Sequence, residues 1–239
     1  MKSLLLVLFS FIVSSLFCQI NLKSLKTAAD KAQEVIVPSK LSAEEIVKGL
    51  KEALIIGTVN TSKNASKQGG FNKNDLIRIS FPPETQNMKN NLIKVGMQSQ
   101  VISFESTLNK AAEDASQFAK QIFIDAIKSM KINDAMSILK GSNNAATIYL
   151  MDQTTNTLYA KFRPIVKKSI AKVKLEKSWN VLANRHNSLP FTKKITPDLV
   201  DYITIQTIEG LFVLISKEEK NIRNNPKARV SDVLKKVFK

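Results

Sequence analysis

Three glutamates near the C-terminal end of the chain are the residues best suited to acid–base chemistry. Glu209 lies within an apolar run, where a buried carboxylate has to be paired, hydrogen-bonded or protonated. A raised pKa at Glu209, with Glu218 and Glu219 nearby, would suit a carboxylate-dependent hydrolase or transferase. A structural interpretation competes with this one, because Arg223 follows Glu219 by four residues, the favourable order for an ion pair on a helix, and Arg229 follows. We favour the structural interpretation, with Glu209 in an internal ion pair or on a partly wet helix face.

Other catalytic and metal-binding chemistry is limited by the presence of one histidine and one cysteine. This composition argues against a cysteine nucleophile, structural zinc and paired histidine ligands, so we predict no metal site and no cofactor. His186 lies among Asn and Arg residues at a predicted helix end, which favours a solvated or capping side chain. Two Ser-x-x-Lys matches, at Ser137 and Ser169, lack the partner motifs of penicillin-recognising enzymes, and we attribute them to chance.

The balance of charge points to partners rather than to chemistry. The chain has 36 Lys and Arg against 20 Asp and Glu, a formal net charge of +16. We predict anionic lipid or acidic envelope components as partners, and no nucleic acid, because aromatic residues are not interleaved with the basic ones for base stacking. A generic solvated basic surface is the alternative. The candidate residues lie near Pro164 and in the last predicted helix: Lys161, Arg163, Lys167, Lys168, Lys172, Lys235 and Lys236.

The N-terminal segment has the pattern of an export signal. Lys2 precedes an apolar run, Leu4 to Val13, that is too short to span a membrane. We predict a signal peptide over residues 1–18, a tether over residues 19–40, and a mature chain without a transmembrane span in the periplasm or envelope. Cys18 is a possible lipidation site, but the large residue before it favours ordinary cleavage.

The remaining chain has the periodicity of packed helices. Ser42 and Glu45 form a predicted capping box, and Leu41 is placed for a hydrophobic staple. Apolar residues then recur at steps of three and four over residues 101–130, which predicts one long packed helix. Ile208 to Ile215 is apolar apart from Glu209, so we expect its helix to be central.

Breaks in this pattern divide the helices. Pro164 predicts a break or kink between helices over 145–158 and 165–173. Gly69, Gly70 and the two prolines that follow predict a long irregular loop near residues 66–83. Such loops are disproportionately functional or mobile. We therefore expect an all-α protein whose residues 41–239 form a single bundle of about eight helices.

Six segments together form a specific pattern: Gly49 to Leu54, Phe123 to Met130, Ile138 to Gly141, Tyr159 to Pro164, Gly210 to Phe212, and Asn225 with Pro226. With these segments the chain resembles, over residues 41–238, a family of exported bacterial proteins grouped as domain of unknown function 4197. The resemblance implies an exported, mostly helical protein, and it implies no activity, ligand or catalytic residue.

The sequence therefore favours a non-enzymatic exported binding or scaffolding protein that acts at acidic envelope surfaces. The missing catalytic constellations and the basic charge support this hypothesis over the hydrolase or transferase. A third hypothesis, a carrier for small apolar ligands, requires a sizeable cavity inside the bundle.

Overall fold

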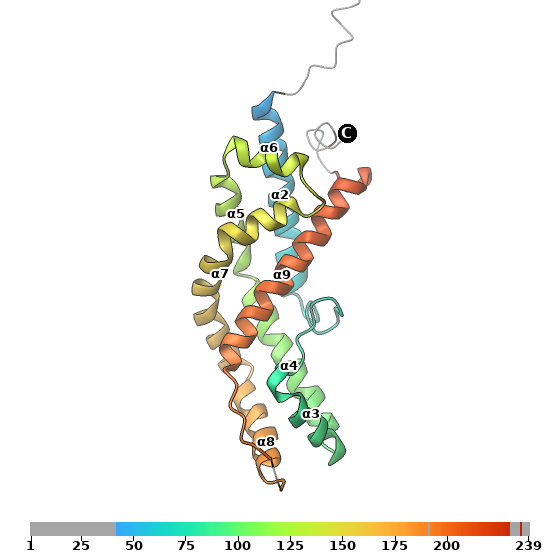
Figure 1. Ribbon diagram of the computed structural model, residues 1–239, viewed down its shortest axis with the longest axis vertical. Helices are drawn as coiled ribbons and strands as arrows, with labels where there is room; N and C mark the ends of the chain where they lie inside the picture. Colours follow the sequence, from blue (N-terminus) through green and yellow to red (C-terminus); the bar gives the residue numbers. More distant parts are fainter. Residues whose placement is uncertain (1–41, 191, 230–234, 236–239) are drawn as a thin grey trace, which may run out of the picture. The chain divides into compact units, whose positions relative to one another are not determined.

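The computed structural model describes residues 42–190, 192–229 and 235, and these contain eight α-helices and no β-strand (Figure 1). The predicted all-α bundle is thereby confirmed. The predictions for the signal peptide, the tether, Cys18, Leu41 and Lys236 lie outside the described residues. The helices are α2 (Ala43–Ser66), α3 (Gln86–Lys94), α4 (Gln98–Ser116), α5 (Ala119–Ser129), α6 (Ile132–Lys140), α7 (Ala145–Lys172), α8 (Leu175–Asn187) and α9 (Leu199–Asn224).

A local sequence signal sets the start of α2, the first helix among the described residues. The Ser42 hydroxyl accepts a hydrogen bond from the Glu45 amide, and the Glu45 carboxylate accepts one from the Ser42 amide, so the predicted capping box is present. α2 ends at Ser66, and an irregular segment over residues 67–82 follows, where the long loop was predicted. This segment, called here the 67–82 segment, precedes a short 3₁₀ turn at Pro83–Thr85.

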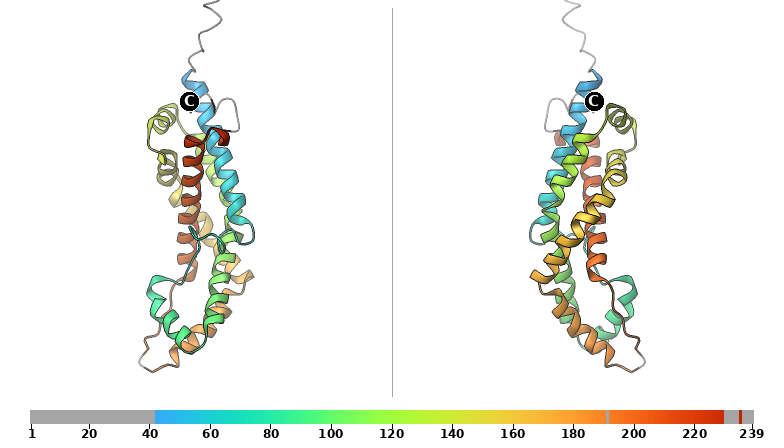
Figure 2. Two further views of the ribbon diagram at one scale, coloured as in Figure 1. Left: turned by 90° about the vertical axis from the view of Figure 1, so that its right-hand side faces the viewer. Right: turned by 90° about the vertical axis from the view of Figure 1, so that its left-hand side faces the viewer.

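The core lies where α2, α4, α7 and α9 pack together within the unit formed by residues 41–239. α9 contacts the other three helices, while α5 and α6 pack on α2 and α7 (Figure 2). α3 and α8 pack on α4 and on each other. Large buried side chains join these groups: the rings of Phe123 and Phe212 lie 5.6 Å apart, and those of Phe104 and Trp179 lie 5.5 Å apart.

The long helix predicted over residues 101–130 is wrong, because α4 ends at Ser116 and α5 begins at Ala119. Two polar side chains at the break bond to the helix backbone. Ser116 donates to the Ala112 carbonyl and Gln117 donates to the Asp114 carbonyl, which competes with the regular helical ladder. Phe118, predicted to be part of the packed stripe, lies between the two helices and is exposed.

Of the break or kink predicted at Pro164, the break is wrong, because α7 runs without interruption through this residue. Proline removes one hydrogen bond to the carbonyl four residues earlier, here that of Ala160. Both Pro164 and Ala160 are exposed, so water can reach the freed carbonyl and the helix continues.

α9 is central but not buried all round. Ile205, Glu209 and Val213, spaced four residues apart, form an exposed stripe along it. Among the described residues α9 is the one helix long and apolar enough to cross a membrane, but half of its most apolar window is buried, as in the core helix of a folded domain.

Candidate functional site

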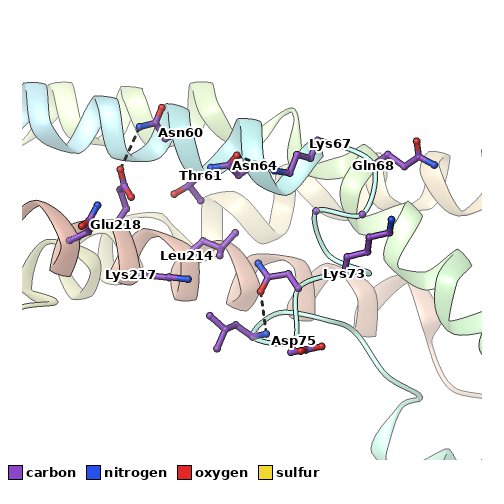
Figure 3. Close-up of a pocket in the computed structure, with 15 residues that line it drawn as sticks. Asn60, Thr61, Asn64, Lys67, Gln68, Lys73, Asp75, Leu214, Lys217 and Glu218 are labelled. Carbon is purple, nitrogen blue, oxygen red and sulfur yellow. Dashed lines mark hydrogen bonds between the residues drawn. The ribbon is translucent and has the colours of Figure 1, made fainter. Parts of the chain in front are cut away.

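A polar cleft of about 900 Å³ lies between the end of α2, the 67–82 segment and the end of α9 (Figure 3). Its α2 wall is a stripe of residues that includes Asn60 and Asn64, one helical turn apart. Its α9 wall is a second stripe, from Leu214 to Asn221. Five carboxamide side chains line the cleft: Asn60, Asn64, Gln68, Asn74 and Asn221.

The charged residues of the polar cleft are of both signs. Lys67, Lys73 and Lys217 supply ammonium groups, and Asp75 and Glu218 supply carboxylates. Glu218 accepts a hydrogen bond of 3.5 Å from Asn60, which joins the two helical walls (Figure 3). The cleft therefore offers donors and acceptors without a strong excess of either charge.

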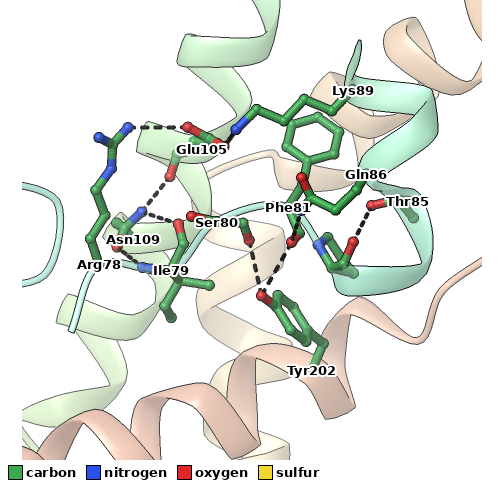
Figure 4. Close-up of polar contacts among 11 residues, drawn as sticks. Arg78, Ile79, Ser80, Phe81, Thr85, Gln86, Lys89, Glu105, Asn109 and Tyr202 are labelled. Atoms are coloured by element: carbon green, nitrogen blue, oxygen red, sulfur yellow. Dashed lines mark hydrogen bonds and ion pairs between the residues drawn. The ribbon is translucent and has the colours of Figure 1, made fainter. Parts of the chain in front are cut away.

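The 67–82 segment is held in place by three polar residues of α4, spaced four apart on one helix face. Glu113 accepts hydrogen bonds of 3.1 Å from the amides of Phe71 and Asn72. Asn109 accepts from the Ile79 amide at 2.9 Å and donates to the Ile79 carbonyl at 2.8 Å (Figure 4). All three side chains are buried, which makes these bonds costly to lose.

Glu105 completes this set at the other end of the segment. Its carboxylate lies 3.1 Å from Arg78 and 2.6 Å from Lys89, which belongs to α3 (Figure 4). These α4 residues were not among the predicted site residues. The available signal was the Glu-x₃-Asn-x₃-Glu spacing, which places three polar groups on one face of a helix.

α9 holds the same segment from the opposite side. A side chain at Gly210 would lie only 2.9 Å from the Phe71 ring and 3.2 Å from Ile77, so glycine permits this close approach. Tyr202 donates a hydrogen bond of 3.1 Å to the Ser80 carbonyl (Figure 4). Burial, followed by the nearby carboxylates of Glu84, Glu105 and Glu209, raises the pKa of Tyr202 to about 12.

The three candidate catalytic glutamates do not come together. Glu209 is exposed and accepts a hydrogen bond from Gln206, which agrees with the predicted wet helix face and not with an internal ion pair or a buried carboxylate. Glu218 lies nine residues later, half a turn round α9, and lines the polar cleft. Glu219 is buried and accepts hydrogen bonds from the amides of Ala146 and Thr147 at the start of α7, at 3.0 and 2.9 Å. Glu219 is thus a structural cap for the N-terminus of α7.

The ion pair predicted between Glu219 and Arg223 is present. Arg223 lies 2.9 Å from the Glu219 carboxylate and donates to the Ile138 carbonyl at 2.9 Å, which links α9 to α6. Arg229 instead donates to two carbonyls at the end of α9, those of Ile222 and Arg223, at 3.1 and 2.7 Å. Arg229 therefore caps the C-terminus of α9.

His186 is buried rather than solvated, contrary to the prediction, with 4% of its surface exposed. The chain after α8 folds back over it, and Nε2 lies 3.3 Å from the Lys193 carbonyl. Nδ1 has no hydrogen-bond partner among the described residues. Those residues also contain no cluster of His, Cys, Asp and Glu that could hold a metal ion.

Both side chains of the second Ser-x-x-Lys match contact the carboxylate of Asp114. Ser169 donates a hydrogen bond of 2.7 Å to Asp114, and Lys172 forms an ion pair with the same group. Burial alone would raise the pKa of Asp114, but the bonds from Lys172 and Ser169 outweigh it, so that the pKa lies below its usual range. The Ser169 hydroxyl is buried and engaged with Asp114, which is a structural arrangement.

The basic residues near Pro164 are all exposed. Residues 161–177 include seven Lys and Arg against one acidic residue. Within the described part of the chain, two of them have ion pairs: Arg163 with Asp198 at 3.3 Å, and Lys172. Lys235 is exposed as well. The residues called here the basic surface are Lys161, Arg163, Lys167, Lys168, Lys172, Lys174 and Lys177, all exposed.

Two apolar spaces beside α2 differ greatly in size. The groove, about 560 Å³, runs along α2 beside Ile55, Ile56 and Ile132. The void beside Leu50 and Leu54 has about 10 Å³, near the size that one water molecule requires. An apolar ligand would find room in the open groove rather than in this void.

Comparison with known proteins gives one match. The sequence model of a family described as "Protein of unknown function (DUF4197)" matches residues 40–239. No curated protein and no solved structure matches the chain.

Proposed function

The chain belongs to the DUF4197 family, and from that premise we propose that it is a non-enzymatic exported protein that binds or scaffolds acidic envelope surfaces. The basic surface on α7 and α8 carries this proposal. Its side chains are exposed, and the lysines at 161, 167 and 168 have no carboxylate within ion-pair distance among the described residues. Each lysine or arginine near an anionic membrane contributes about 1 kcal/mol.

The positions of these residues support a surface rather than a pocket. Lys161, Lys168 and Lys172 lie seven and eleven residues apart, so they project from one side of α7. Arg163 lies nine residues before Lys172, half a turn round α7, so it points to the opposite side of the helix. A broad anionic surface can contact the lysines at 161, 168 and 172 at once, whereas a small ligand cannot.

Vesicle co-sedimentation tests the proposal. We expect the purified protein to bind phosphatidylcholine vesicles that contain phosphatidylglycerol, and to bind more weakly as salt rises to about 0.5 M, since screening removes the attraction. The triple variant Lys161→Gln, Lys167→Gln, Lys168→Gln should lose about tenfold or more in affinity.

A scattered triple variant provides the matched control. Lys63→Gln, Lys120→Gln and Lys220→Gln remove the same charge from exposed sites on α2, α5 and α9. Equal losses of vesicle affinity in both triple variants would show that net charge alone causes the binding, and would contradict binding through the basic surface. Absent or salt-independent binding by the unmodified protein would reject the proposal.

A further inference from the structure

We propose that the polar cleft is a binding site for a short neutral oligosaccharide. Each of the five carboxamide side chains in its walls has both hydrogen-bond donors and an acceptor. Sugar hydroxyls also donate and accept hydrogen bonds, so the two kinds of group match. Asn60 and Asn64 face the cleft from α2 and Asn221 faces it from α9, so a ligand between them can bond to both walls. The volume of about 900 Å³ lies within the usual range of ligand sites.

The charges of the cleft favour a neutral ligand. Three lysines are opposed by Asp75 and Glu218, and the C-terminal end of α2 adds partial negative charge from its unpaired carbonyls. No single charge dominates, so hydroxyl groups rather than an ionised group are the features that this lining can recognise. The cleft therefore differs in chemistry from the basic surface, and the inference does not depend on the proposed function.

The cleft is also preorganised. Its third wall, the 67–82 segment, is fixed by the Glu113 and Asn109 hydrogen bonds and by the close contact at Gly210. A ligand does not have to order this wall on binding, which removes part of the entropic cost. Leu76, 59% exposed, and Leu214 add apolar surface at the cleft, against which the C–H face of a sugar ring can pack.

Nuclear magnetic resonance titration with two neutral trisaccharides, chitotriose and maltotriose, tests the inference. We expect at least one to bind with a Kd of about 1 mM or tighter, and to shift the side-chain amide signals of Asn60, Asn64 and Asn221. The double variant Asn64→Leu, Asn221→Leu should weaken that binding by about tenfold, since it removes hydrogen bonds from both helical walls. Binding should change little with salt, in contrast to vesicle binding by the basic surface.

Asn156→Leu is the control, because Asn156 is an exposed carboxamide on α7 outside the cleft. It should leave sugar binding unchanged. Failure of both trisaccharides to bind, or signal shifts that map elsewhere, would overturn the inference. Equal weakening by Asn156→Leu would do the same. Stronger binding of citrate, an anion without the sugar hydroxyl pattern, would identify the cleft as an anion site and reject the neutral ligand.

Discussion

Glu113 and Glu219 each accept hydrogen bonds from two consecutive backbone amides of a segment far away in the sequence. Glu113 binds the start of the 67–82 segment, and Glu219 binds the start of α7. In both places the carboxylate satisfies amides that would otherwise be buried without a partner. These two side chains therefore have structural roles. Of the three candidate catalytic glutamates, Glu218 is the one that lines the polar cleft.

Asp114 gives a residue-scale prediction about pH. Its lowered pKa means that the ionised carboxylate stabilises the folded state, through the hydrogen bond from Ser169 and the ion pair with Lys172. This contribution is fully present above the ordinary value of 3.8 and is lost as the pH falls through the lower folded pKa. Asp114→Asn should thus unfold at lower urea than the unmodified protein at pH 7, and the difference should narrow at acid pH.

Asp125→Asn serves for comparison, because Asp125 is exposed and bonds to Gln121 within its own helix. We expect it to change the urea midpoint little at any pH. A gap for Asp114→Asn that stays constant down to pH values below 3.8 would show that the ionised carboxylate is not the source of the stability.

At the scale of elements, the contact between α9 and the 67–82 segment makes a second prediction. Gly210→Ala places a methyl group 2.9 Å from the Phe71 ring, and overpacking of this kind costs about 1–3 kcal/mol. Gly57→Ala lies inside α2, where the added methyl would meet side-chain atoms at 3.4 Å, an ordinary contact. Since alanine favours a helix over glycine by about 1 kcal/mol, Gly57→Ala should stabilise the protein while Gly210→Ala destabilises it.

Thermal unfolding of the two variants provides the measurement. Opposite signs of the change in Tm support a tightly packed segment on α9. If Gly210→Ala raised Tm as much as Gly57→Ala, helix propensity alone would determine the stability change at both positions. The 67–82 segment would then not be tightly packed on α9.

Signals that act within a few residues predicted the elements well, and signals that depend on neighbours in space did not. The capping box at Ser42 is local, and so it was found. The outcome at Pro164 depends on whether water can reach the freed Ala160 carbonyl, and sequence spacing carries no such information. Likewise, a buried Glu209 was one of the alternatives because its neighbours are apolar, but its stripe of α9 faces outward.

The polar cleft shows the same limit. The long loop was expected from its glycines and prolines, yet its walls were not. Asn60 and Asn221 are ordinary exposed residues of two separate helices, and they become one site only when α2 packs against α9. The fixed position of the loop rests on Glu113, whose partners lie 41 and 42 residues away in the sequence.

At the scale of the whole molecule, the excess of positive charge affects stability as well as binding. A net charge of +16 repels itself in the compact state, and the described residues contain only five ion pairs to offset this. Salt screens such repulsion, because the Debye length falls from about 30 Å at 0.01 M to about 8 Å at 0.15 M.

The excess charge therefore predicts that Tm rises between these two salt concentrations. For a domain of this size each 1 kcal/mol corresponds to about 2–4 °C, so a change of a few degrees is measurable by calorimetry in sodium chloride.

Lys161→Gln, Lys167→Gln and Lys168→Gln together should raise Tm at low salt and reduce its dependence on salt, since they remove part of the repulsion. A Tm that falls with salt would mean that the ion pairs outweigh the repulsion. In that case the basic surface would be internally compensated, and its attraction for an anionic partner would lose its physical basis.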